Sequence, residues 1–200
     1  MAANDSEMRQ RILGAALQAF AEHGYAGTST LHIATRAKVS KRDLYAHFAS
    51  KQAALVDCIK ARSEQMQLPA QLSVPRTRKA LATTLATFAT QVLVETSHPT
   101  VMAMFRLAIA ETAHAPEVAQ ALDERRKANR RTLSALFAGC QSAGLMPDGD
   151  TAEMASRYLS LVWGDLMLGL LLGVAARPSR AQIERRVTEA TTAFLQLYPQ

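Results

Sequence analysis

The stretch Gly24–Leu55, GYAGTSTLHIATRAKVSKRDLYAHFASKQAAL, decides the fold of this chain. Two hydroxyl residues, Thr28 and Ser29, precede a short amphipathic segment and are natural helix N-caps. The run from Ser40 to Asp43 has the S-x-x-D form of a capping box, so a further helix begins at Ser40. Short helices joined by a turn of three or four residues are typical of a helix-turn-helix, with its motif at about 29–48.

The same helical period continues on both sides of this stretch, and no segment keeps a strand alternation. The sequence therefore predicts an all-α protein with two domains: a head at 6–66 that contains the helix-turn-helix, and a helical-bundle body at 76–198. The proline-containing stretch Leu68–Pro75 separates them. Helices are expected at about 6–23, from 29 and 40, at 50–66, and then at 77–96, 99–113, 116–143, 150–175 and 179–197.

Helical phase indicates which side of the helix that begins at Ser40 is free. Leu44 and Phe48 are four residues apart and share a face that must pack inside the head. The residues that point outward are then Arg42, Asp43, Tyr45 and Ala46. The helix N-terminus at Ser40 and Lys41 offers unpaired N–H groups to a phosphate, and Lys51 can do the same one helix later.

Positive charge is concentrated in the same place. The chain has 23 Lys and Arg against 17 Asp and Glu, a net charge of +6, which suits an acidic partner such as nucleic acid. Residues 36–51 hold five basic residues and one acidic residue, so 5 − 1 = +4 of that excess lies in the motif.

The quoted stretch resembles the DNA-binding signature of the TetR family, which includes AcrR-like one-component repressors. The elements in register are Gly-Tyr, Thr-Ser, Ile-Ala, Val-Ser-Lys, Leu-Tyr, His-Phe and Ser-Lys. The resemblance implies phosphate contacts by Thr28, Ser29, Lys41, Tyr45, His47 and Lys51, and base-edge contacts by Arg42, Asp43 and Ala46. This chain departs from the family pattern at Lys38, a turn position where the family commonly has glycine, and also at Leu31-His32 and Arg42. His47 has a second interpretation as an i,i+4 partner of Asp43.

The body offers candidates for a small apolar effector, although a methionine and aromatic stripe also occurs in plain cores. These candidates are Met102, Phe105, Arg106, Ile109, Leu136, Trp163 and Met167. Arg106 lies on an otherwise apolar stripe, where a buried arginine needs a partner. We expect an internal pair with Asp165, or an anionic group of the effector.

The helix expected at 150–175 is apolar nearly all round, and such a helix must be covered. Residues 159–176 approach the length of a membrane span, but Ser160 and Asp165 interrupt them, so we expect a buried helix and no membrane partner. Together with 179–197 it predicts a homodimer interface, which is also where the resembled family dimerises. The segment from Arg106, RLAIAETAHAPEVAQAL, is similar to the body of some family members.

Several other functions are disfavoured. The two cysteines lie in apolar helical patterns without a metal-ligand cluster, and the N-terminus is not a secretory signal, so we expect a cytoplasmic protein without metal or cofactor. No nucleophile elbow or phosphate loop suggests an enzyme. The charged run Asp123–Arg131 is interpreted as a solvated face rather than a second nucleic-acid patch. The best prediction is a homodimeric repressor that releases a palindromic operator DNA when the effector binds; the alternative is a non-specific, nucleoid-type DNA-binding protein.

Overall fold

The computed structural model describes residues 2–65, 69, 71–110, 112 and 116–200, and within these residues it contains helices and no strand. The expected limits at Met66, Leu68 and residue 113 lie outside the described residues. The chain divides into two compact units: residues 1–66 with 103–123, and residues 67–102 with 124–200. Residues 103–123, which the sequence analysis assigned to the body, therefore group with the head.

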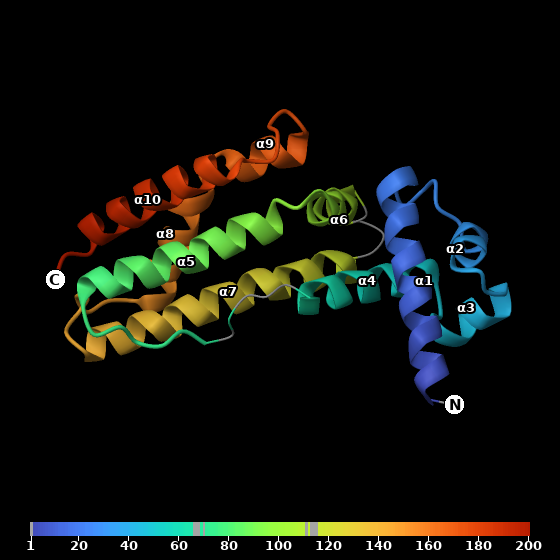
Figure 1. Ribbon diagram of the computed structural model, residues 1–200, viewed down its shortest axis with the longest axis horizontal. Coiled ribbons are helices and arrows are strands. Elements are labelled where there is room, and N and C mark those ends of the chain that lie inside the picture. Colours follow the sequence, from blue (N-terminus) through green and yellow to red (C-terminus); the bar gives the residue numbers. More distant parts are fainter. Residues whose placement is uncertain (1, 66–68, 70, 111, 113–115) are drawn as a thin grey trace. The chain divides into compact units, whose positions relative to one another are not determined.

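The first unit contains α1 (Ala2–His23), α2 (Thr30–Ala37), α3 (Lys41–His47) and α4 (Lys51–Gln65), shown in Figure 1. Its core joins apolar faces of these four helices, among them Ile12, Ile33, Leu44 and Leu55, each without exposed surface. The later part of α6 (Pro99–Ala110) adds Met104 and Ala108 to this core, which explains its grouping with the head.

The capping signals read from the sequence are confirmed. The Ser29 side chain accepts a hydrogen bond from the His32 backbone N–H at 3.0 Å and begins α2. Ser40 and Asp43 form the complete capping box of α3, each side chain accepting from the other residue's backbone N–H. Both helices of the motif therefore begin where the hydroxyl residues predicted.

Lys38 ends α2 in the left-handed conformation, with φ 54° and ψ 47°. Its backbone N–H closes the helix against the carbonyls of Ala34 and Thr35. A side chain in this conformation costs about 1–2 kcal/mol, which glycine avoids. The departure from the family's glycine at this position therefore carries a stability cost.

Replacing Lys38 by Gly should therefore stabilise the head. After allowance for the greater freedom of glycine in the unfolded chain, we expect a gain of about 0.5–1 kcal/mol in the free energy of unfolding. Chemical denaturation measures this change, and Lys38→Ala serves as the control because alanine bears the same strain. A Lys38→Gly variant no more stable than Lys38→Ala would contradict the assignment.

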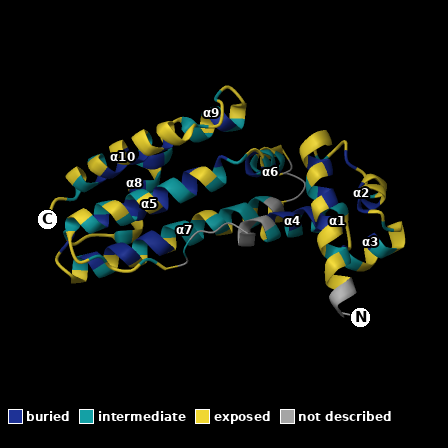
Figure 2. Ribbon diagram, viewed as in Figure 1, coloured by how far each residue is buried: buried dark blue, intermediate teal, exposed yellow. Residues whose placement is uncertain are grey.

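The second unit is built from α5 (Arg78–Thr96), most of α7 (Pro116–Ser142), α8 (Thr151–Trp163), α9 (Leu166–Leu172) and α10 (Arg180–Leu197). Figure 2 shows the buried stripes of α5 and α7, which belong to a continuous apolar core. Tyr158 lies in this core, where its hydroxyl donates to the Leu85 carbonyl at 2.8 Å and bonds Thr191 at 2.9 Å. Burial raises the pKa of Tyr158 well above its ordinary value.

The single helix expected at 150–175 is wrong. It is broken at Gly164, whose φ of 47° and ψ of −128° end α8, and the two helices meet at a bend of 57°. The backbone conformation at Gly164 requires glycine, and periodicity could not reveal it because apolar residues continue across the break. Among the described helices, none by itself is long and apolar enough to span a membrane, and only the bent pair α8 and α9 together meets those criteria.

Candidate nucleic-acid interface

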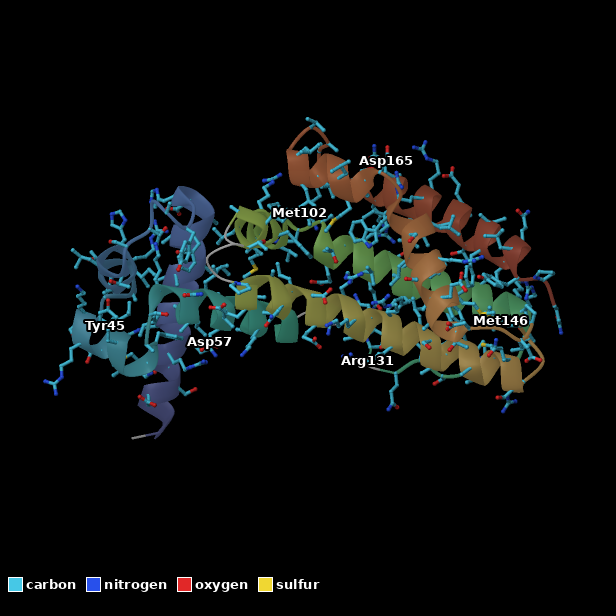
Figure 3. The ribbon with its side chains drawn as sticks, turned by 180° about the vertical axis from the view of Figure 1, so that it is seen from behind. Tyr45, Asp57, Met102, Arg131, Met146 and Asp165 are labelled. Atoms are coloured by element: carbon cyan, nitrogen blue, oxygen red, sulfur yellow. The ribbon has the colours of Figure 1, made fainter. Side chains whose placement is uncertain are left out.

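The outer face of α3 presents the side chains that phase analysis selected for DNA. Lys41, Arg42, Tyr45 and Ala46 are exposed, whereas Leu44 and Phe48 are buried. Figure 3 shows Tyr45 on this helix. The division of the helix into an inward and an outward face is therefore as predicted.

Tyr45 is held in place by two neighbours on this surface. Its ring is 46% exposed, and its hydroxyl lies 3.3 Å from the Thr30 hydroxyl of α2. The Lys41 ammonium lies 5.8 Å from the ring centroid, close enough for a cation–π interaction. These contacts orient the phenol at the junction of α2 and α3 while leaving it accessible.

Asp43 is less available than expected. Its carboxylate accepts hydrogen bonds from the Ser40 backbone N–H at 3.1 Å and from the Ser40 hydroxyl at 2.6 Å. These hydrogen bonds lower the pKa of Asp43 from its ordinary value, so the group is ionised and engaged in the capping box. Ser40 is exposed at the start of α3, where the first N–H groups of the helix begin.

The expectation that the Thr28 hydroxyl contacts a phosphate is corrected by its position. Thr28 is only 1% exposed, and its hydroxyl lies within hydrogen-bond distance of the Ala19 carbonyl at 3.0 Å and the Gly24 carbonyl at 2.7 Å. The hydroxyl therefore ties the loop after α1 to that helix. Its neighbour Ser29 remains exposed.

His47 also turns inward. Its side chain is 9% exposed, and its Nε2 lies 3.5 Å from the Asp5 carboxylate of α1. The i,i+4 interpretation with Asp43 is supported, because a charge at His47 contributes to the lowered pKa of the Asp43 carboxyl. The second partner, Asp5, could not be predicted, because sequence spacing does not reveal a contact between α1 and α3. The small exposure corrects the expected phosphate contact of this side chain.

Lys51 has a structural role in the head. Its ammonium donates to the carbonyls of Tyr25 at 2.7 Å and Thr28 at 2.9 Å, and it lies 4.0 Å from the centroid of the Tyr25 ring. An ammonium has three N–H donors, so one remains after these two hydrogen bonds. Lys51 thus fastens the loop before α2 and keeps a donor for an anion.

The positive charge of the motif is only partly neutralised. Arg36 pairs with Glu22 at 2.6 Å, which lowers the pKa of the Glu22 carboxyl. In the described part of the chain, no carboxylate forms an ion pair with Lys38, Lys41 or Arg42, and all three are exposed. These exposed cations lie in the turn and at the start of α3, where Arg42 interacts electrostatically with the neighbouring Asp43 carboxylate.

The predicted effector residues fall in both units. In the second unit Met102 and Leu136 are buried, and Trp163 and Met167 are half-buried. In the first unit Phe105 is half-buried, while Arg106 and Ile109 are exposed. The expected buried arginine at position 106 is therefore wrong. Asp165 is 95% exposed and lies 3.4 Å from Arg186 of the same unit.

Arg125, which the sequence analysis placed on a solvated face, is half-buried. Its Nε and Nη2 atoms are buried without a hydrogen-bond partner in the structure. The signal in the sequence was its phase: Arg125 is eleven residues, close to three whole turns, before Leu136 of the core. In the described residues, no cluster of three or more His, Cys, Asp or Glu side chains suits a metal ion.

Known proteins match this chain over both units. The family model for bacterial regulatory proteins of the tetR family matches residues 12–57, and the model for the AefR-like transcriptional repressor C-terminal domain matches residues 83–200. The HTH-type transcriptional regulator YvkB of Bacillus subtilis (strain 168) is 25% identical over 177 residues, which are 88% of this chain and 90% of the relative.

Two solved structures resemble this chain over nearly its whole length. The flavonoid-responsive regulator FrrA is 31% identical, with a TM-score of 0.78 and coverage of 96% of this chain and 97% of its own. A TetR-family regulator from Mesorhizobium loti has the same fold, with a TM-score of 0.84 at 24% identity over 98% of each chain. Proteins of this family bind operator DNA without acting as enzymes and usually form homodimers. From the two family models and the capped motif with its exposed α3 face, we conclude that this chain belongs to the TetR family of transcriptional regulators.

Proposed function

We propose that this protein is a homodimeric repressor that binds a palindromic operator and releases it when a small apolar ligand binds the body. The observation that carries the DNA-binding part is the outer face of α3, where Lys41, Arg42 and Tyr45 are exposed beside a capped helix N-terminus. Phosphates favour such a terminus, and side chains on one helix face can reach the major groove.

The residues divide into two proposed roles. Ser29, Ser40, Lys41, Tyr45 and Lys51 hold phosphates, which fixes the register of the head on the duplex. Arg42 and Ala46 face base edges, and Ala46 presents a methyl group that suits thymine. Asp43 acts mainly through the capping box that positions Arg42 beside it, because its carboxylate is already hydrogen-bonded.

Selection of binding sites from a library of random duplexes tests this function. We expect enrichment of a palindrome whose half-sites are centred about 34–36 Å apart or slightly more. A non-specific nucleoid protein would enrich no sequence. The basic charge of the chain alone accounts for non-specific binding, so enrichment is the discriminating result.

The phosphate contacts should be visible in the salt dependence of DNA affinity. Tyr45→Ala and Lys51→Ala should each weaken binding to every duplex alike, and Lys51→Ala should also reduce the slope of log affinity against log salt by about 1. Fluorescence anisotropy at several salt concentrations measures both effects. Lys60→Ala, on an exposed position of the same helix, is the control. A loss confined to one base position would contradict the phosphate assignment.

Support for the dimer comes from the exposed surface of α8–α10. A groove of about 520 Å³ runs beside α10, and its lining mixes apolar residues such as Leu161 and Ala193 with charged residues such as Arg185 and Glu189. Leu168 and Leu172 of α9 are 61% and 67% exposed, and Val174 is 80% exposed. Apolar surface of this kind is covered in most proteins, and a second copy of the chain is the partner expected from the family.

Replacing the small Ala193 of this groove by a large acidic residue should therefore separate the dimer. We expect wild type to have twice the chain mass by light scattering at micromolar concentration, and Ala193→Glu to have the monomer mass. Thr192→Glu is the matched control, since Thr192 is the exposed neighbour outside the groove lining. Wild type at monomer mass would rule out the dimer, whereas a dimeric Ala193→Glu variant would move the interface elsewhere.

A further inference from the structure

Arg125 is a half-buried arginine on α7 with two nitrogen atoms that lack a hydrogen-bond partner. Its Nε and Nη2 atoms have almost no solvent-accessible surface and no hydrogen bond in the structure. Nearby charged residues behave differently: Lys127 pairs with Glu124 at 3.0 Å, and Arg131 is exposed on α7 (Figure 3). Arg125 alone of these three cations turns two buried donors inward.

Arg125 belongs to the second unit. Ser134 of α7 bonds Thr151 of α8 at 2.8 Å, and Arg130 lies 3.4 Å from Ser156, so the first half of α8 lies against α7. The end of α8 lies beside α10 instead, because Arg186 of α10 donates to the Trp163 carbonyl at 3.1 Å.

The end of α5 lies near Arg125. Arg78 at the start of α5 donates to the carbonyl of Leu145 just after α7, so α5 and α7 run antiparallel. The Glu95 charge near the end of α5 acts on Arg125. The Arg125 guanidinium therefore lies between the early turns of α7 and the end of α5.

A charge left in this state is costly. Removal from water lowers the pKa of Arg125, and the attraction of Glu95 only partly opposes that effect. Arginine nevertheless stays protonated in proteins, so the group remains a buried cation. Buried charges are normally paired and hydrogen-bonded, and an unpaired one destabilises the fold. A residue with these properties suits a site that is completed by another molecule.

The two donors also have a defined geometry. In a guanidinium group the Nε–H and the Nη2–H on the same edge point in parallel, which matches the two oxygens of a carboxylate. We propose that Arg125 receives the carboxylate of the effector through this edge, and that the effector is an apolar acid. This inference rests on the proposed ligand-responsive function, and it names the chemical class of the ligand.

The apolar part of the ligand is inferred from the buried residues of the same unit. Leu136 lies further along the inward face of α7, and Met102 is a buried residue at the start of α6. Aliphatic and thioether side chains favour an apolar body, while one charged group fixes its orientation.

Thermal unfolding of the full chain with defined probes tests the proposal. The probes are benzoate, cinnamate, octanoate and decanoate, each compared with its primary amide, which has a similar shape and no charge. The variants are Arg125→Met, Arg125→Lys and, as matched control, Arg131→Met. We expect at least one acid to raise the Tm of wild type and Arg131→Met by about 4 °C or more at a saturating concentration. Its amide should give no such rise.

Arg125→Met should lose the acid-dependent rise, and Arg125→Lys should retain only part of it because an ammonium lacks the parallel fork. Without probe, Arg125→Met should unfold at a temperature equal to or above that of wild type, since the unpaired charge is gone. The proposal is overturned if ligand-free Arg125→Met melts well below wild type, which indicates a purely structural arginine. It is also overturned if no acid acts in an Arg125-dependent way, or if amides act as strongly as acids.

Binding of the ligand-free wild type to its selected palindrome separates this inference from the proposed function. If wild type binds the palindrome and none of the acids acts through Arg125, only the carboxylate site fails. If wild type shows no sequence preference, the regulator function itself fails.

Discussion

Arg42→Ala should abolish the preference for guanine at one position of each half-site. Arg42 is exposed at the second residue of α3 and points away from the buried Leu44 and Phe48. A bidentate contact to the O6 and N7 acceptors of guanine is worth about 1–3 kcal/mol, which corresponds to about 5–150-fold discrimination. Site selection with wild type and variant measures the base preference directly.

Two further variants make this result specific. Arg42→Lys keeps the charge but loses the planar fork, so it should lose most of the guanine preference while retaining affinity. Lys38→Ala removes a charge from the neighbouring turn and should leave the base preference unchanged. If Arg42→Ala retains the wild-type preference at every position and loses affinity only, Arg42 contacts phosphate or solvent.

Arg78→Met should give the largest loss of stability among single changes in the body. The guanidinium donates to three backbone carbonyls: Leu145 at 2.9 Å, and Leu195 and Tyr198 near the end of α10. Hydrogen bonds to a charged group are worth about 1.5–3 kcal/mol each, and a cation at a helix C-terminus adds to them. With some rehydration of the carbonyls, we expect a loss of about 2–4 kcal/mol.

Thermal unfolding measures this effect as a fall of about 4–16 °C in Tm, the range expected for a chain of this size. Arg76→Met is the matched control, because Arg76 is exposed two residues earlier. Arg78→Lys should recover part of the loss, since an ammonium reaches fewer of the carbonyls. An Arg78→Met variant with the Tm of the control would show that these hydrogen bonds do not hold α10.

Local signals predicted the motif well. The helix starts at Ser29 and Ser40 could be read because a cap and its partner lie within three residues of each other. The faces of α3 could be read because the spacing of Leu44 and Phe48 is a property of one helix. The departure from the family's glycine marked Lys38 as a position where a positive φ would be costly, and the structure has that conformation there.

The corrected predictions depended on contacts between helices. Inside the head, the Thr28 hydroxyl contacts carbonyls of α1 and of the loop after it, and the His47 side chain lies near the Asp5 carboxylate of α1. Local sequence spacing does not reveal such contacts. Arg106 was placed on an apolar stripe, but α6 leaves that position exposed. Arg125 belongs to the charged run Asp123–Arg131, and the polarity of the whole run conceals that Arg125 lies on the same helical face as the core residue Leu136.

Sequence-specific binding to DNA is the central claim, and the ratio of two dissociation constants tests it most directly. The constants are those of wild type for its selected palindrome and for a scrambled duplex of equal length and composition, measured at physiological salt. Specific regulators bind their sites about 10³-fold or more tightly than other DNA, and we predict a ratio in that range. A ratio within a few-fold of one, with both constants equally dependent on salt, would contradict the account and identify a non-specific DNA-binding protein.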